Sequence, residues 1–238
     1  MRKPPPDLTP SQTIGPFFAY GLTAQQYGYG QPQVAGADLL AEGGDGIEGE
    51  RLALSGTVFD GEGVAVDDAL IEIWQADAQG RYASTPAADG AHVNAHFTGF
   101  GRCGTGAPAG TFTFLTIKPG LVSNPHLTVH PHSTINPGTV GAAAPHITVI
   151  VFARGLLSHL ITRAYFDDEA TANACDPTLL AVDPARRDTL IARRRPARTA
   201  PDRSGHDASA DGPTNGHVAR YQFDIHLSGP RETVFFDL

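Results

Sequence analysis

One short stretch has the spacing of a metal site carried on a β-strand. His146 and Thr148 flank Ile147 at the start of a long apolar run. Residues two apart on a strand point to the same face, so a His-x-His pair there can present two imidazoles to one metal ion. Here the second position is a threonine, and a hydroxyl is a poor ligand for a transition metal. The pattern is typical of a metal site that has lost part of its ligand set.

Six motifs, in order along the chain, resemble those of the intradiol ring-cleavage dioxygenases. They are TPSQTIGPFF (9–18), EIWQAD (72–77), GRY (80–82), IKPG (117–120), LITRAYFDDE (160–169) and YQFDI (221–225). The opening motif, FARG (152–155) and ETVFFD (232–237) are similar to the alpha subunit of the two-chain members of this family. The resemblance implies a mainly β fold, an intradiol dioxygenase-type β-sandwich with long loops and few short helices.

The resemblance also assigns the metal positions. Catalytic members of the family hold a ferric iron with two tyrosines and two histidines. Tyr82 and His146 match one ligand of each kind, whereas Val122 and Thr148 stand where the other two would be. An arginine that precedes the histidine pair in catalytic relatives is replaced by alanines at 142–144. The resemblance therefore implies that this chain binds no metal and that the beta subunit holds the Fe(III).

The same resemblance implies a function within a hetero-oligomer. The chain would complete the active site of its iron-bearing beta subunit, which opens the ring of 3,4-dihydroxybenzoate with O₂ to give 3-carboxy-cis,cis-muconate. Its own contribution would be substrate-binding positions and cavity wall: Thr13, Gly15, Pro16, Phe17 and Arg154. Glycine permits close backbone approach and proline stiffens the turn beside it.

Arg154 has two interpretations. It follows an apolar strand, and because a guanidinium stays protonated it must reach water or an anionic partner. That partner is either an Asp or Glu of this chain, in a structural ion pair, or the carboxylate of the aromatic substrate.

Two other functions remain open at this level. The chain could be a self-contained catechol-type dioxygenase that uses Tyr82, His146 and a displaced ligand such as His130 or His132. It could also be a non-enzymatic β-sandwich binding module. His126, His130 and His132 lie in a proline-punctuated stretch, which favours solvated loop histidines over a metal site.

Composition sets the broad class. The 238 residues carry a net charge of −8, which disfavours nucleic acid and anionic membranes as partners. No apolar run is long enough to span a bilayer, and the N-terminus lacks the apolar core of a leader, so we expect a cytoplasmic protein. Cys103 and Cys175 have no paired-motif spacing and are expected to be free thiols. We expect a single domain over 1–238, with an N-terminal arm and loops at 1–50, a core at 51–238 and a flexible loop at 196–217.

Alternating and apolar patterns predict the main strands. They cover 52–59, 69–74, 111–117, 147–153 and 221–227. The run at 147–153 is apolar almost throughout, which predicts a central strand covered on both faces. One helix is predicted over 185–195, because Asp183-Pro184 is a good helix start and Pro196 a stop. The arginines 193–195 would then lie at its C-terminal end, where positive charges interact favourably with the helix dipole. We favour this structural role over an anion-binding site.

Overall fold

The computed structural model describes residues 12–15, 17–30, 35–41, 43, 46–83, 97–106, 110–122, 142–196 and 218–237. Its strands are β1 (Arg51–Phe59), β2 (Leu70–Gln75), β3 (Phe100–Gly104), β4 (Thr111–Ile117), β5 (His146–Phe152), β6 (Leu160–Phe166), β7 (Ile191–Arg195), β8 (Ala219–Gln222) and β9 (Ile225–His226). Its helices are short: α1 (Phe18–Leu22), α2 (Ala170–Asn173), α3 (Pro177–Ala181) and the 3-10 turns η1 (Ala24–Tyr27) and η3 (Arg187–Leu190). The mainly β class with few short helices is confirmed. Within these residues, no helix has the length and apolarity that a membrane crossing needs.

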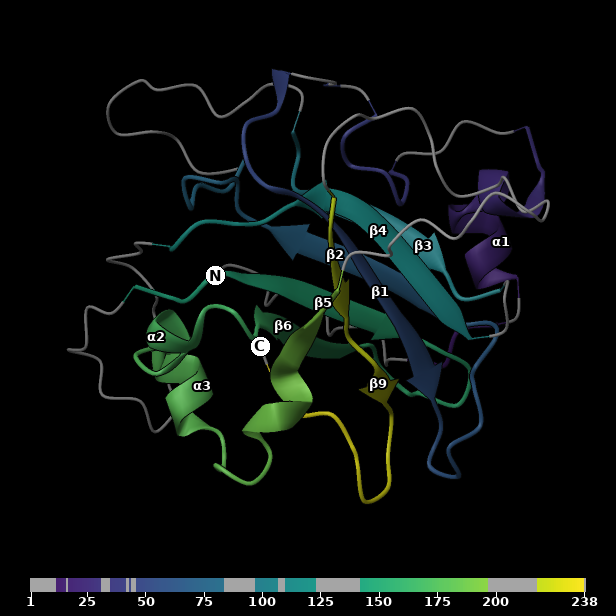
Figure 1. The fold of residues 1–238 in the computed structure, drawn as a ribbon. Coiled ribbons are helices and arrows are strands. Elements are labelled where there is room, and N and C mark those ends of the chain that lie inside the picture. Colours follow the sequence, from purple (N-terminus) through teal and green to yellow (C-terminus); the bar gives the residue numbers. More distant parts are fainter. Residues whose placement is uncertain are drawn as a thin grey trace, which may run out of the picture.

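The strands form two layers joined at one edge. Their order is β3-β2-β5-β6-β7-β8-β1-β4, with β9 paired to β1. In Figure 1, β1 and β4 pass in front of β2, β5 and β6, and one hydrophobic cluster takes side chains from all five strands. Strand β7 makes the joint, because it pairs with β6 on one side and β8 on the other. This arrangement is the predicted sandwich.

Alternation along the strands decides what the core contains. In β4, Phe112 and Phe114 are buried while Thr113 and Leu115 are exposed, as the period of two requires. The predicted strand at 221–227 is divided into β8 and β9, which pair with successive parts of β1. Tyr221, Phe223 and Ile225 remain buried through the break.

Strand β5 corrects one prediction. It is central, between β2 and β6, but only one of its faces is fully covered. Ile147, Val149 and Val151 have no exposed surface, whereas Thr148 and Ile150 are half-buried. The expectation of cover on both faces is wrong, because an apolar side chain such as Ile150 can also lie on a partly covered outer face.

The predicted helix over 185–195 is wrong. Asp183 starts a turn, since its carboxylate accepts the N–H of Ala185 and its carbonyl accepts that of Arg186. The chain then makes the single turn η3 and becomes β7. Pairing of 191–195 with two neighbouring strands outweighs the helix propensity of alanine and arginine. The Asp-Pro helix start is instead found at Asp176–Pro177, where Asp176 caps α3 through a 2.7 Å bond from the Leu179 N–H.

Three of the sequence motifs meet in a charged network at the joint between the layers. Lys118 Nζ lies 3.0 Å from an oxygen of Asp168 and 2.7 Å from one of Glu169. The Tyr221 hydroxyl donates to Asp168 at 2.8 Å, and Arg194 pairs with the same carboxylate. Burial lowers the pKa of Lys118, but its bonds to the two carboxylates outweigh burial and raise it. These motifs therefore serve the fold.

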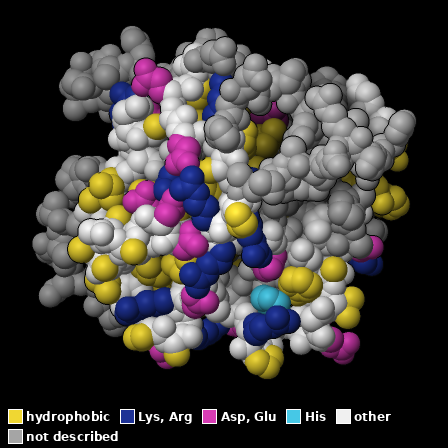
Figure 2. Space-filling model, in the orientation of Figure 1, with side chains coloured by type: hydrophobic (Ala, Val, Ile, Leu, Met, Phe, Trp, Pro, Cys, Tyr) yellow, Lys and Arg dark blue, Asp and Glu magenta, His cyan; other side chains and the backbone are white. Residues whose placement is uncertain are grey.

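Two arginines of the run Arg193–Arg195 pair with carboxylates. Arg193 pairs with Asp188, and Arg194 bridges Asp168 and Glu50. Figure 2 shows basic and acidic side chains interleaved on this face of the molecule. The prediction that these arginines lie at a helix end is wrong, because 191–195 is a strand, and the partners of Arg193 and Arg194 are carboxylates.

Candidate functional site

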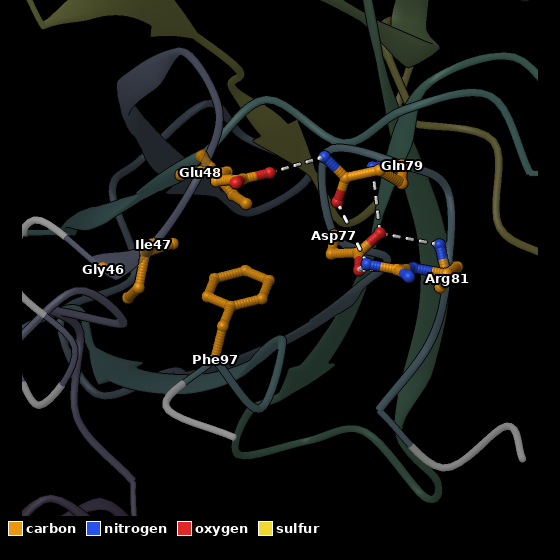
Figure 3. Close-up of a pocket in the computed structure, with 8 residues that line it drawn as sticks. Gly46, Ile47, Glu48, Asp77, Gln79, Arg81 and Phe97 are labelled. Carbon is orange, nitrogen blue, oxygen red and sulfur yellow. Dashed lines mark hydrogen bonds and ion pairs between the residues drawn. The ribbon is translucent and has the colours of Figure 1, made fainter. Parts of the chain in front are cut away.

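A tight turn after β2 positions Tyr82. The buried carboxylate of Asp77 accepts the backbone N–H groups of Gln79 and Arg81, each at 2.9 Å, and pairs with the Arg81 side chain. Figure 3 shows these side chains converging beside Phe97, where they line a cavity of about 370 Å³. These bonds of Asp77 hold the backbone of the turn, and so they fix the direction of the chain at Tyr82.

Two glycines pack this turn against the segment that carries Val122. Gly80 has a φ of +77°, and a Cβ there would lie 1.8 Å from the carbonyl oxygen of Leu121. A Cβ on Gly120 would lie 2.4 Å from the carbonyl oxygen of Ala78. The backbones can approach this closely only with glycine at both positions. The sequence positions of the two family tyrosines are therefore neighbours in space.

Aliphatic side chains pack around Val122, where the family has its second tyrosine ligand. Val122 is buried with Ala76 and Ala143, Tyr82 packs against this cluster, and the backbone of Val122 pairs with that of Ala143. None of the three aliphatic side chains can bind a metal. Tyr82 also stacks on Trp74, with ring centroids 6.1 Å apart, and burial raises the pKa of its phenol. It is a packed, protonated tyrosine at neutral pH.

His146 is buried and uncharged. Its Nδ1 lies 2.7 Å from the carbonyl oxygen of Ala144, so that nitrogen carries the proton and donates. Burial, helped by the positive charge of Arg163, lowers the pKa of His146 to about 4. Its ring packs against Tyr165, with centroids 5.5 Å apart. Its other nitrogen, Nε2, is then the one with a free lone pair.

Thr148 lies between Trp74 of β2 and Arg163 of β6 in the strand register. From the sequence, Arg163 is only one member of a family motif, with no role assigned to it. Its place opposite Thr148 depends on the pairing of β5 with β6, which local alternation does not give. The structure thus adds a guanidinium to the remnant ligand positions.

These residues do not fit the ferric iron that the family implies. A phenol and one imidazole remain, and the other two positions offer an isopropyl group and a hydroxyl, with a cation beside them. Among the described residues, no group of three His, Cys, Asp or Glu side chains is placed to hold a metal ion. His126, His130 and His132 lie outside the described residues.

Of the predicted substrate-binding residues, Thr13 lies against the loop that carries Arg154. The Thr13 hydroxyl accepts the Gly155 N–H at 2.9 Å, which ties the opening segment to the loop after β5. A cavity of about 200 Å³ lies between them and is lined in part by Ile14, Phe152 and Leu156. Thr13 is thus held against the loop that carries Arg154. Pro16 lies outside the described residues.

Arg154 already has an anionic partner. Its Nε pairs with the carboxylate of Asp68, whose side chain is 21% exposed, while that of Arg154 is 60% exposed. No partner for its terminal nitrogens is found in the described part of the chain. The ion pair with Asp68 is the one that the structural interpretation predicts. The terminal nitrogens stay available for a substrate carboxylate, as the other interpretation requires.

The other opening residues face outward. Phe17 is 79% exposed, and a Cβ built on Gly15 would meet open space. Among the described residues nothing requires glycine at position 15. A close approach there would have to come from outside the described residues.

Comparison with known proteins agrees with this geometry. The family model described as Dioxygenase matches residues 23–229. The alpha chain of protocatechuate 3,4-dioxygenase from Burkholderia cepacia is 42% identical over 231 residues, which is 97% of each chain. The beta chain from the same organism is 35% identical over 181 residues, covering 76% of this chain and 66% of that one.

A solved structure supports the fold alone. The 3-chlorocatechol 1,2-dioxygenase from Rhodococcus opacus 1CP superimposes with a TM-score of 0.53 at 22% identity, over 76% of this chain and 61% of that one. The match of the family model spans most of the sequence, and the similarity to the alpha chain covers 97% of it. The chain belongs to the intradiol ring-cleavage dioxygenase family.

Proposed function

We propose that this chain is the alpha subunit of a protocatechuate 3,4-dioxygenase. It pairs with a beta subunit in the O₂-dependent intradiol cleavage of 3,4-dihydroxybenzoate to 3-carboxy-cis,cis-muconate. One observation carries the proposal: Val122 and Thr148 occupy two ligand positions in a chain that otherwise keeps the family pattern. The full-length similarity to a named alpha chain supports it. A cytoplasmic location stays a prediction.

In this proposal the iron belongs to the beta subunit. The buried Val122 and the Thr148 hydroxyl cannot replace a phenolate and an imidazole, which leaves Tyr82 and His146 as two of the four family ligands. When bound in the beta subunit, Fe(III) would activate the catecholate for reaction with O₂. The part left to this chain is to shape and charge the cavity.

The residues for that part are Thr13, Gly15, Pro16, Phe17 and Arg154. Thr13 fixes the opening segment through its bond with Gly155, and the exposed Phe17 projects from the same segment. Asp68 holds Nε of Arg154, which leaves the terminal nitrogens to meet the substrate carboxylate. A guanidinium and a carboxylate form charge-assisted hydrogen bonds that are stronger than neutral ones.

The two other functions predict different behaviour. A self-contained catechol-type enzyme would need ligands beyond Tyr82 and His146, and it would turn over substrate when purified alone. A binding module would form no complex with a second chain of the family. The similarity to a beta chain favours a two-chain enzyme, because homologous chains can share one interface in a pseudo-symmetric pair.

The test is reconstitution. The chain and a beta subunit from the same source are expressed separately and together, and O₂ uptake with protocatechuate is followed for each preparation. We expect no activity from this chain alone and ring cleavage from the co-expressed chains that form a hetero-oligomer. Activity of this chain alone, or a beta subunit that neither binds it nor gains activity, would refute the proposal.

A further inference from the structure

Arg163 lies beside the lost ligand position. It is cross-strand from Thr148, and the next pair along the same two strands on this face is Tyr165 with His146. Directly opposed residues on antiparallel strands point to the same face, with Cβ atoms roughly 5 Å apart. Arg163, Thr148 and His146 therefore share one face of the sheet. Trp74, the other neighbour of Thr148, stacks on the Tyr82 ring.

The guanidinium of Arg163 is held by neutral groups. Its Nη1 donates to the Thr178 hydroxyl at 3.2 Å and to the Tyr165 hydroxyl at 3.4 Å, and the group lies 5.9 Å from the ring centroid of Phe236. No carboxylate in the described ranges forms an ion pair with it. Asp176 is reached only through the Tyr165 hydroxyl, and its oxygens already accept backbone N–H groups. Because a guanidinium does not lose its proton in a protein, a fixed positive charge remains here, with no direct counter-ion among the described residues.

The strand register places Arg163 near both remnant ligands. His146 lies two residues before Thr148 on β5, and Tyr82 stacks on Trp74, which pairs with Thr148 from the other side. These two residues come from different segments, one on β5 and one on the turn after β2. Arg163 therefore puts its charge beside the former site.

We propose that Arg163 excludes metal ions from this site, so that the absence of iron is enforced by charge as well as by missing ligands. A cation and a metal ion in one partly buried space repel each other strongly, because the field there is less screened than in water. The inference rests on the proposed function, in which the iron belongs to the beta subunit. For a pair of homologous chains, it gives a physical reason why the metal loads into one chain and not the other.

The test rebuilds the missing imidazole with and without the charge. Thr148→His restores a His-x-His pair beside Tyr82. It is combined with Arg163→Gln, which removes the charge but keeps a hydrogen-bonding side chain, or with Arg163→Lys, which keeps the charge. Each variant is purified as the complex with the beta chain, and Zn²⁺ binding above the wild-type complex is measured by equilibrium dialysis. Circular dichroism and size-exclusion chromatography confirm folding and assembly.

We expect the double variant Thr148→His/Arg163→Gln to bind Zn²⁺ about tenfold or more tightly than Thr148→His alone. The Arg163→Lys combination should behave like Thr148→His alone. The inference is overturned if Thr148→His binds Zn²⁺ equally well with Arg163 present and with Arg163→Gln, including the case where neither binds. It is also overturned if Arg163→Lys restores binding as Arg163→Gln does.

A separate measurement tests the proposed function itself. Iron analysis of the wild-type chain, separated from the beta chain, needs none of these variants. Stoichiometric iron in that sample would refute the proposed function whatever the Zn²⁺ result.

Discussion

In the proposed function, Arg154 is the residue whose charge meets the substrate carboxylate. Since Asp68 pairs with its Nε and the side chain is still 60% exposed, we expect its terminal nitrogens to attract the carboxylate of protocatechuate. A charge-assisted contact of this kind is worth about 1 to 3 kcal/mol, so Arg154→Ala should lower kcat/KM roughly ten- to a hundredfold. Steady-state kinetics of the assembled enzyme measure this effect.

Catechol, which lacks the carboxylate, is the control substrate and should lose much less activity. Asp68→Asn releases Nε of Arg154 and should raise KM for protocatechuate by less than Arg154→Ala does. Equal losses on both substrates, with a lowered Tm, would mean that the ion pair with Asp68 is structural only.

His146 makes stability depend on pH. Its pKa is about 4 in the folded chain and 6.5 ordinarily, so between these values the unfolded chain binds more protons than the folded one. Stability is therefore full above about pH 6.5 and is lost as the pH falls toward 4, by about 2 kcal/mol between pH 7 and pH 5.

His146→Gln keeps an N–H for the Ala144 carbonyl and does not titrate. Urea unfolding of the complex at pH 7 and pH 5 should show a larger loss for the wild type than for His146→Gln. An equal loss in both would show that His146 is not the group responsible.

At this scale the sequence revealed residues that match a family pattern, such as Tyr82, His146 and the substitutions Val122 and Thr148. It did not reveal the roles of Asp68 and Arg163. Those roles depend on tertiary structure, which brings side chains from distant segments together. Pairing partners cannot be deduced from local periodicity.

At the scale of elements, the contact between the Tyr82 turn and the 118–122 segment depends on Gly80. Gly80→Ala puts a Cβ 1.8 Å from the Leu121 carbonyl oxygen at a φ of +77°. We expect a loss of more than about 3 kcal/mol in unfolding free energy, since both backbone strain and the clash oppose folding. Chemical denaturation measures it.

Gly28 supplies a matched control, because its φ is +79° and a Cβ there would meet nothing within 4 Å. Gly28→Ala carries the strain alone and should cost about 1 to 2 kcal/mol. Equal costs at the two positions would mean that the close approach at Gly80 does not exist in the folded chain.

Helices and strands were predictable where the hydrophobic pattern of the sequence matches the burial in the fold. Polar and apolar residues alternate in β4, so both the strand and its buried face follow from the sequence. Residues 185–195 have helix formers but become η3 and β7, because Leu190 and Ala192 are buried and Arg194 pairs with carboxylates of other segments. Those partners lie far away along the chain, so local propensity gave the wrong element.

At the scale of the whole molecule, the opening segment and the loop after β5 expose large apolar side chains. Phe17 is 79% and Leu157 is 74% exposed. A partner that buries them explains this exposure, and without it such surfaces favour aggregation. We expect the chain to aggregate alone and to form a stable complex with the beta subunit on size-exclusion chromatography.

Leu157→Ser should improve solubility of the isolated chain and weaken the complex. Val64→Ser, at a residue 59% exposed in the turn after β1, is the matched control and should leave the complex unchanged. A wild-type chain that is monodisperse alone and ignores the beta subunit would contradict the assembly.

The central claim is that this chain serves an iron enzyme without binding the iron. Tyr82→Phe in the purified complex tests it most directly, because Tyr82 is the one phenol left at a family ligand position. We predict that iron content per alpha-beta pair and the tyrosinate-to-iron absorption band both equal those of the wild type. Loss of the iron or of that band on Tyr82→Phe would contradict the account.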